Sequence, residues 1–174
     1  MMKKRLLSLF LAICIVMSLV PATALAAIVK NDDAVAMYRL YNPNTGEHFY
    51  TGSEVEKNNL VSLGWNDEGV GFSFPTTTGK PVHRLFEPDT GEHLYTMDEA
   101  EKEALMASGW NYEGVAFNSG FEDEVTQFRL HNPNETVGAY HFTASTEERD
   151  NLMEAGWKYQ GIGWYSCWKG TDTP

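Results

Sequence analysis

Cysteine is almost absent from this chain of 174 residues, which has only Cys14 and Cys167. Cys14 lies in an N-terminal segment that we expect to be removed, which leaves one cysteine in the mature chain. One cysteine cannot form a disulfide within a chain, even in an oxidising compartment. Packing and hydrogen bonds must therefore stabilise the fold.

Basic residues are also scarce, with 13 Lys and Arg against 24 Asp and Glu, a formal net charge of −11. Proteins that bind phosphate backbones or anionic lipid surfaces need clusters of Lys and Arg. The charge therefore argues against nucleic acid and against a membrane surface as partners. It favours a soluble protein, which we expect to be a monomer.

A long apolar run occurs once, at residues 6–20, and none follows it. It comes after Lys3-Lys4-Arg5, and Ala24-Leu25-Ala26 provides an A-x-A cleavage signal. This arrangement is typical of a secretory signal peptide, and the run is too short to favour a membrane anchor. The sequence predicts a signal peptide at residues 1–26 and one extracellular domain at residues 27–174, either released or associated with the cell wall.

Common catalytic motifs are missing as well. We find no G-x-S-x-G, H-E-x-x-H or phosphate-binding loop, and nothing around Cys167 marks a nucleophile. Asn44 and Asp89, in two predicted turns, do not have the spacing of a calcium-binding loop. We expect no cofactor, no metal ion and no catalytic residue.

What the chain does contain is the same pattern three times. Arg39-Leu40-Tyr41-Asn42-Pro43 returns as RLFEP at residues 84–88 and as RLHNP at residues 129–133. A Gly-Trp pair follows each time, at residues 64–65, 109–110 and 156–157. A period of about 45 residues indicates one supersecondary unit that buries its apolar face against its copies.

Each unit reads as strand, turn, strand, helix and strand, over about residues 37–74, 82–119 and 127–168. Three β-β-α-β units predict an α+β, mainly β fold. Closure around a pseudo-threefold axis would remove exposed sheet edges. The expected forms are a trefoil-like barrel and a three-bladed propeller-like ring.

The ends of the helices are specified most clearly. Ser53 with Glu56, Asp98 with Glu101, and Ser145 with Glu148 have the spacing of capping boxes, in which the acid bonds back to the N–H of the cap. The glycine of each Gly-Trp pair should end its helix in the left-handed conformation. The tryptophan after it is expected to fold back into the core.

Residues 38–51 (YRLYNPNTGEHFYT) and 63–72 (LGWNDEGVGF) resemble a bacterial repeat known as domain of unknown function 5648, and the resemblance covers residues 37–165. It implies an extracellular module that sometimes accompanies cell-wall or carbohydrate-active enzymes, without an established activity. The third unit departs from the pattern. Gly-Glu-His of the first two units becomes Gly138-Ala139-Tyr140, which places in doubt a site based on that pair in unit three.

The candidate binding residues come from the first two units. Adjacent strand residues point to opposite faces, so His48 shares a face with Tyr50 rather than with Glu47. The repeated arginine has two alternative roles, an ion pair with Glu47 or Glu92, or a structural bond to backbone carbonyls. Tyr41 and its equivalents are candidates for stacking on sugars. The predicted ligand-binding residues are Arg39, Tyr41, His48, Tyr50, Arg84, Phe86, His93 and Tyr95.

These features favour a secreted, non-catalytic binding module for carbohydrate or cell-wall glycan. Two alternatives remain open. One is a protein-interaction or structural surface module, which a broad exposed apolar patch would favour. The other is a cell-wall-associated hydrolase, which requires a carboxylate or histidine with a partner in a deep cleft.

Overall fold

The computed structural model describes residues 34–76, 79–122 and 124–167. The predicted signal peptide lies outside the described residues. The first unit contains β1 (Ala34–Tyr41), β2 (His48–Thr51), α1 (Glu54–Ser62) and β3 (Asn66–Pro75). The second contains β4 (Pro81–Phe86), β5 (His93–Thr96), α2 (Glu99–Ala107) and β6 (Asn111–Asn118). The third contains β7 (Val125–His131), β8 (Tyr140–Thr143), α3 (Thr146–Glu154) and β9 (Lys158–Ser166).

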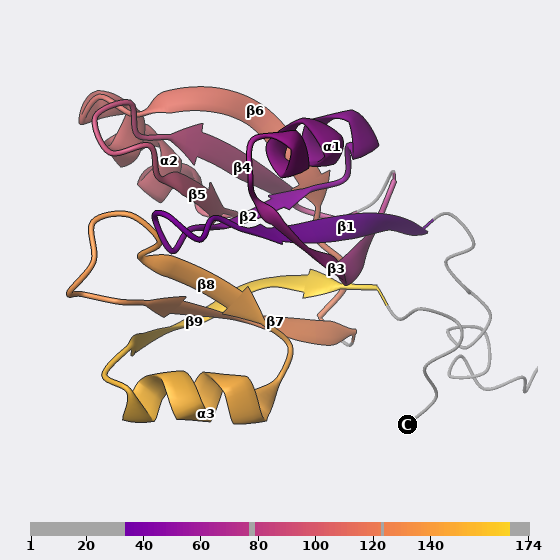
Figure 1. Ribbon diagram of the computed structural model, residues 1–174. Coiled ribbons are helices and arrows are strands. Elements are labelled where there is room, and N and C mark those ends of the chain that lie inside the picture. Colours follow the sequence, from indigo (N-terminus) through magenta and orange to yellow (C-terminus); the bar gives the residue numbers. More distant parts are fainter. Residues whose placement is uncertain (1–33, 77–78, 123, 168–174) are drawn as a thin grey trace, which may run out of the picture. The chain divides into compact units, whose positions relative to one another are not determined.

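The predicted β-β-α-β order is confirmed in all three units, and the fold is mainly β. Each unit forms its own antiparallel sheet of three strands, with the first strand in the centre: β2-β1-β3, β5-β4-β6 and β8-β7-β9. The helix lies beside the sheet of its own unit (Figure 1). Because the described strands form three separate sheets, they do not build the trefoil-like barrel expected as one alternative.

The last strand of each unit starts earlier than its apolar alternation suggests and carries a bulge. The partners of Tyr38 and Leu40 on β3 are Val70 and Asp67, so two residues of β3 lie opposite the single residue Arg39. Gly69 lies in this bulge with φ of 84°, a conformation that glycine adopts without steric cost. Alternation alone cannot reveal such an extra residue.

The helix N-termini depart from the reciprocal capping box. Ser53 Oγ accepts the N–H of Glu56 at 3.3 Å, as expected. The N–H of Ser53, however, donates to Thr51 Oγ1 at 3.0 Å, and the second and third helices repeat this bond through Thr96 and Thr143. The expected return bond from the acid was therefore wrong, because a threonine already satisfies that N–H. Each capping acid is free to bond elsewhere.

The helix C-termini are as predicted. Gly64 has φ of 97°, and the N–H groups of Gly64 and Trp65 donate to Val61 O and Leu60 O, the pattern of a Schellman motif. Trp65, Trp110 and Trp157 are half-buried rather than enclosed in the core. The helices contribute no fully buried residue, and Val61, Met106 and Met153 are exposed at equivalent positions.

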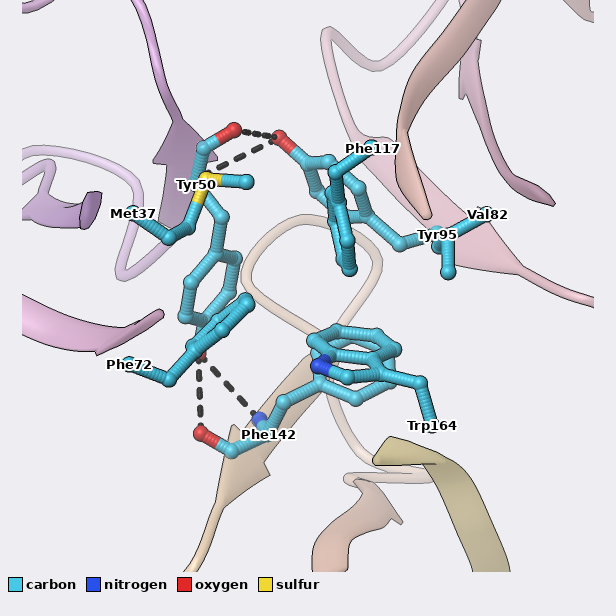
Figure 2. Packing of buried hydrophobic residues seen from close by; sticks show 8 residues of the cluster. All are labelled: Met37, Tyr50, Phe72, Val82, Tyr95, Phe117, Phe142 and Trp164. Carbon is cyan, nitrogen blue, oxygen red and sulfur yellow. Dashed lines mark hydrogen bonds between the residues drawn. The ribbon is translucent and has the colours of Figure 1, made fainter. Parts of the chain in front are cut away.

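The main apolar core lies between the three sheets. Figure 2 shows its eight residues, which come from all three units: Met37, Tyr50, Phe72, Val82, Tyr95, Phe117, Phe142 and Trp164. Tyr50 and Tyr95 are each 1% exposed. The structure therefore places these two predicted ligand-binding side chains in the core.

Candidate functional site

Two buried tyrosine hydroxyls join the units. Tyr95 Oη donates to Tyr50 O at 2.8 Å and accepts the Tyr50 N–H at 3.1 Å. Tyr50 Oη donates to Phe142 O at 3.1 Å and accepts the Phe142 N–H at 3.2 Å (Figure 2). Burial raises the pKa of both tyrosines, which keeps the hydroxyls protonated as donors. The first unit is thus bonded to the second and to the third through one core.

The Glu-His pairs also act between units. Glu47 Oε1 accepts the N–H of His93 at 3.0 Å and its ring Nδ1–H at 2.7 Å. Glu92 in turn accepts the N–H of Gly138 in the third unit. Ala139 occupies the corresponding position of unit three and offers no carboxylate. As expected from the strand geometry, Glu47 does not work with its own neighbour His48.

The repeated arginine connects the capping acid of one unit to another unit. Arg84 Nη1 lies 3.1 Å from Glu56 Oε2, and Arg129 Nη1 lies 2.7 Å from Glu101 Oε2. Arg39 Nη1 lies 3.9 Å from Glu148 Oε1. Both expected roles, pairing with Glu47 or Glu92 and bonding to carbonyls, were therefore wrong. The sequence does contain both partners, because the arginine and the capping acid occur in all three units. A local sequence pattern cannot show that the arginine of one unit pairs with the acid of another.

The described cavity richest in predicted site residues lies between the first and third units. We call it the seam pocket. It has a volume of about 440 Å³ and includes Arg39, Tyr41 and His48 of the prediction. Its lining residues are Arg39, Tyr41, Thr45, Gly46, His48, Glu68, Asn132, Glu135, Val137, Gly138, His141, Glu148, Leu152 and Trp157.

His141 distinguishes this junction from the other two. Phe49 and Leu94 hold the equivalent positions, so a buried apolar residue has been replaced by a buried histidine. The His141 ring lies 4.5 Å from the ring of His48, and Nε2 donates to Glu148 Oε1 at 3.0 Å. His141 was not among the residues predicted from the sequence. Its signal was the polar substitution at a position that is apolar in the other units.

Two residues of the seam pocket, Glu148 and His48, have shifted pKa values. The hydrogen bond from His141 lowers the pKa of Glu148 to about 2, with a further contribution from Thr143. Burial, together with the charges of His141 and Arg39, lowers the pKa of His48 to about 3. His48 is therefore neutral at physiological pH, and its 3.5 Å contact with Glu68 is not an ion pair there.

The charges of the seam pocket decide which ligands suit it. Arg39 Nε lies 2.8 Å from Glu68 Oε2, so two acids face one guanidinium. Glu135 adds a third carboxylate, which disfavours an anionic ligand. Among the described residues, no group of three or more His, Cys, Asp or Glu is placed to hold a metal ion.

Two further clefts lie at the other junctions and have equivalent linings. The first cleft, between the first and second units, has about 340 Å³ and is lined by Tyr50, Thr51, Gly52, Ser53, Glu56, Phe74, Arg84, Glu113, Val115 and Ala116. The second cleft, between the second and third units, has about 630 Å³ and is lined by Lys80, Tyr95, Thr96, Met97, Asp98, Glu101, Arg129, Gln160, Ile162 and Gly163.

The predicted site residues thus separate into four groups. Arg39, Tyr41 and His48 meet in the seam pocket, and Arg84 lines the first cleft. Phe86 and His93 pack on each other with ring centroids 4.9 Å apart. Tyr50 and Tyr95 belong to the core, although each contributes to the wall of a cleft.

This combination of fold and site defines a β-rich module of three similar units with cavities at their junctions. Residues 36–167 match the family model described as "Domain of unknown function (DUF5648)", and the chain belongs to this family. No curated protein and no solved structure matches it. Within the described residues, no helix is both long and apolar enough to cross a membrane.

Proposed function

We propose that this protein is a secreted, non-catalytic module that binds extracellular carbohydrate, cell-wall glycan in particular. The N-terminal sequence supports export. The observation that carries the proposal is the seam pocket, in which aromatic rings and fixed hydrogen-bonding groups line one cavity between the first and third units. Its ligand is a neutral sugar, because carboxylates outnumber cations in the pocket.

The chemistry of the lining supports a polyhydroxyl ligand. Glu68 and Glu148 accept hydrogen bonds from hydroxyls, Arg39 and Asn132 donate to them, and neutral His48 can do either. Tyr41 and Trp157 are half-buried, with ring surface next to these polar groups. An apolar ring face beside a few fixed polar groups is the usual composition of a small-molecule site.

We further propose that the three units close around a pseudo-threefold axis as a propeller-like ring. Support comes from the bonds of the first unit to both others and from the equivalent linings of the two clefts. Several weak sites on one ring can act together on a polymer. A polymeric wall glycan gains most from this arrangement.

The test compares Tyr41 with its matched position in the second unit, Phe86. Binding of neutral N-acetylglucosamine oligosaccharides and neutral β-glucan oligosaccharides is measured by calorimetry. We expect Tyr41→Ala to weaken binding about tenfold, or about 1.4 kcal/mol, and Phe86→Ala to leave it unchanged. Absence of binding above background, or equal losses in both variants, would contradict the proposal. Release of reducing sugar from these oligosaccharides would instead support the alternative of a cell-wall-associated hydrolase.

A protein-interaction module is the second candidate, and one observation favours it. Val70, Val115 and Ile162 are 40–53% exposed and equivalent, so each unit presents an apolar residue on its last strand. Val70 is the one of these three residues that lines none of the described cavities, so Val70→Glu should leave glycan binding intact if the first proposal holds. Loss of a partner protein with unchanged glycan binding would favour this second function.

A further inference from the structure

We propose that the second cleft is a separate sugar-binding site, in which a hydroxyl of the ligand takes the place of a tyrosine hydroxyl that the third unit lacks. The site shares its ligand class with the proposed function but uses none of the residues of the seam pocket. An experiment can therefore contradict one of the two sites without contradicting the other.

The two tyrosine hydroxyls that are present have the same role. Each bonds both the N–H and the C=O of one residue on the short second strand of another unit. Tyr95 Oη does this at Tyr50, and Tyr50 Oη does it at Phe142. A hydroxyl is suited to this role because a single oxygen both donates and accepts.

The equivalent third position is Phe142, which would face Tyr95. The rings of Tyr50, Tyr95 and Phe142 meet edge to face in every pair, with centroids 5.6, 5.8 and 6.3 Å apart and interplanar angles of 85–88° (Figure 2). Phe142 makes ring contacts of the same kind as the two tyrosines but has no hydroxyl. Among the described residues, no side-chain hydroxyl bonds the backbone of Tyr95, which lines the second cleft.

A second substitution leaves another donor in the same cleft without a partner. In the first cleft, Arg84 Nε donates to Glu113 at 2.6 Å. Gln160 replaces that glutamate in the second cleft, and the buried Nε of Arg129 has no hydrogen-bond partner among the described residues. Buried donors are seldom left unpaired, so an acceptor oxygen at Arg129 Nε, together with a hydroxyl at the backbone of Tyr95, would complete this cleft.

These groups specify the class of ligand. The backbone of Tyr95 requires an oxygen that both donates and accepts, which excludes ammonium groups and ionised carboxylates at that point. Arg129 Nε requires an acceptor oxygen nearby. Neighbouring hydroxyls on a sugar ring provide both, and about 630 Å³ is enough room for one. The second cleft is larger than the first, which has about 340 Å³, and this agrees with room for a sugar ring.

The experiment uses NMR on the mature chain with glucose, galactose and N-acetylglucosamine as probes. We expect at least one of them to shift both the Tyr95 amide signal and the Arg129 Nε–H signal. Phe142→Tyr should abolish this response, or weaken binding at least tenfold, and should raise the melting temperature. A probe response that survives Phe142→Tyr, or no response to any probe, would overturn the proposal.

Gln160→Glu provides a second test on an exposed side chain, in case Phe142→Tyr does not fold. It should restore the partner of Arg129 Nε and weaken the sugar response at least severalfold. Tyr41→Ala is the matched control and should leave the Tyr95 signal responsive. Loss of the response in Tyr41→Ala alone would assign the sugar to the seam pocket and contradict a separate site.

Discussion

At the scale of single residues, equivalent positions in the three units have different chemistry, and these differences locate the candidate sites. Phe49 and Leu94 are apolar where His141 forms the wall of the seam pocket. Tyr50 and Tyr95 carry hydroxyls where Phe142 has none. What varies between units is therefore more informative about binding than what repeats.

Glu92 gives a prediction about pH. Burial raises the pKa of its carboxyl to about 7, Glu47 adds to the rise, and the N–H of Gly138 opposes it. The folded protein therefore holds a proton that the unfolded chain releases near pH 4.5. The protonated Glu92 carboxyl therefore stabilises the fold fully below pH 4.5. This stabilisation is lost as the pH rises through about 7.

The measurement compares the wild type with Glu92→Gln, which resembles the protonated acid. The difference in their unfolding free energies should change by up to about 3 kcal/mol between pH 4.5 and 7.5. The wild type should lose stability relative to the variant as pH rises. Taking the difference removes the opposite effect of His48, whose lowered pKa makes the fold more stable as the pH rises from about 3 to 6.5. A difference that is constant with pH would contradict the burial of a titrating Glu92.

Most of the sequence reasoning succeeded for residues that act locally. The strand order, the caps at Ser53 and Asp98, and the helix-ending Gly64 depend on neighbours in sequence, so pattern was enough to predict them. The partners of Arg84 and Glu47 lie in other units, at sequence separations that no local pattern encodes. Five of the eight predicted site residues therefore join one unit to another: Arg39, Tyr50, Arg84, His93 and Tyr95.

At the scale of elements, the hairpin turns of different units contact each other. Gly138 is required in its turn both because its φ is positive and because another turn packs against it. Gly46, Gly91 and Gly138 all have positive φ, of 81°, 86° and 70°. A Cβ on Gly91 would meet nothing within 4 Å, whereas a Cβ on Gly138 would lie 2.5 Å from Gly46 C. The turn before β8 is thus packed directly against the turn before β2.

Gly91→Ala and Gly138→Ala therefore form a matched pair. Both substitutions introduce positive-φ strain, which costs about 1 kcal/mol. Gly138→Ala should cost clearly more, about 2–4 kcal/mol in total, because backbone atoms must also move. Denaturant unfolding of both variants provides the measurement. Equal losses would show that the two turns are not in close contact.

At the scale of the whole described fold, the first and third units are joined as closely as neighbours in sequence. Tyr50 Oη bonds the backbone of Phe142, and the N–H of Cys167 donates to Ser73 O at 2.9 Å. The core of Figure 2 draws on all three units. The stability of each unit therefore depends on both other units. In a linear repeat array, by contrast, each unit is stabilised only by its neighbours in sequence.

Removing the third unit tests whether stability is shared among all three units or arises as in a linear array. In a linear array, a chain of residues 27–122 would keep its two units folded, with one interface lost. Here that chain leaves the Tyr50 hydroxyl and the Glu92 carboxyl without their partners in the third unit, and it exposes Met37 and Phe72 to water. We expect residues 27–122 to show no cooperative thermal transition by circular dichroism, whereas residues 27–174 should melt in one step. A cooperative transition in the shorter chain would mean that each unit depends only on its neighbour in sequence. The seam pocket would then be a surface feature rather than a product of closure.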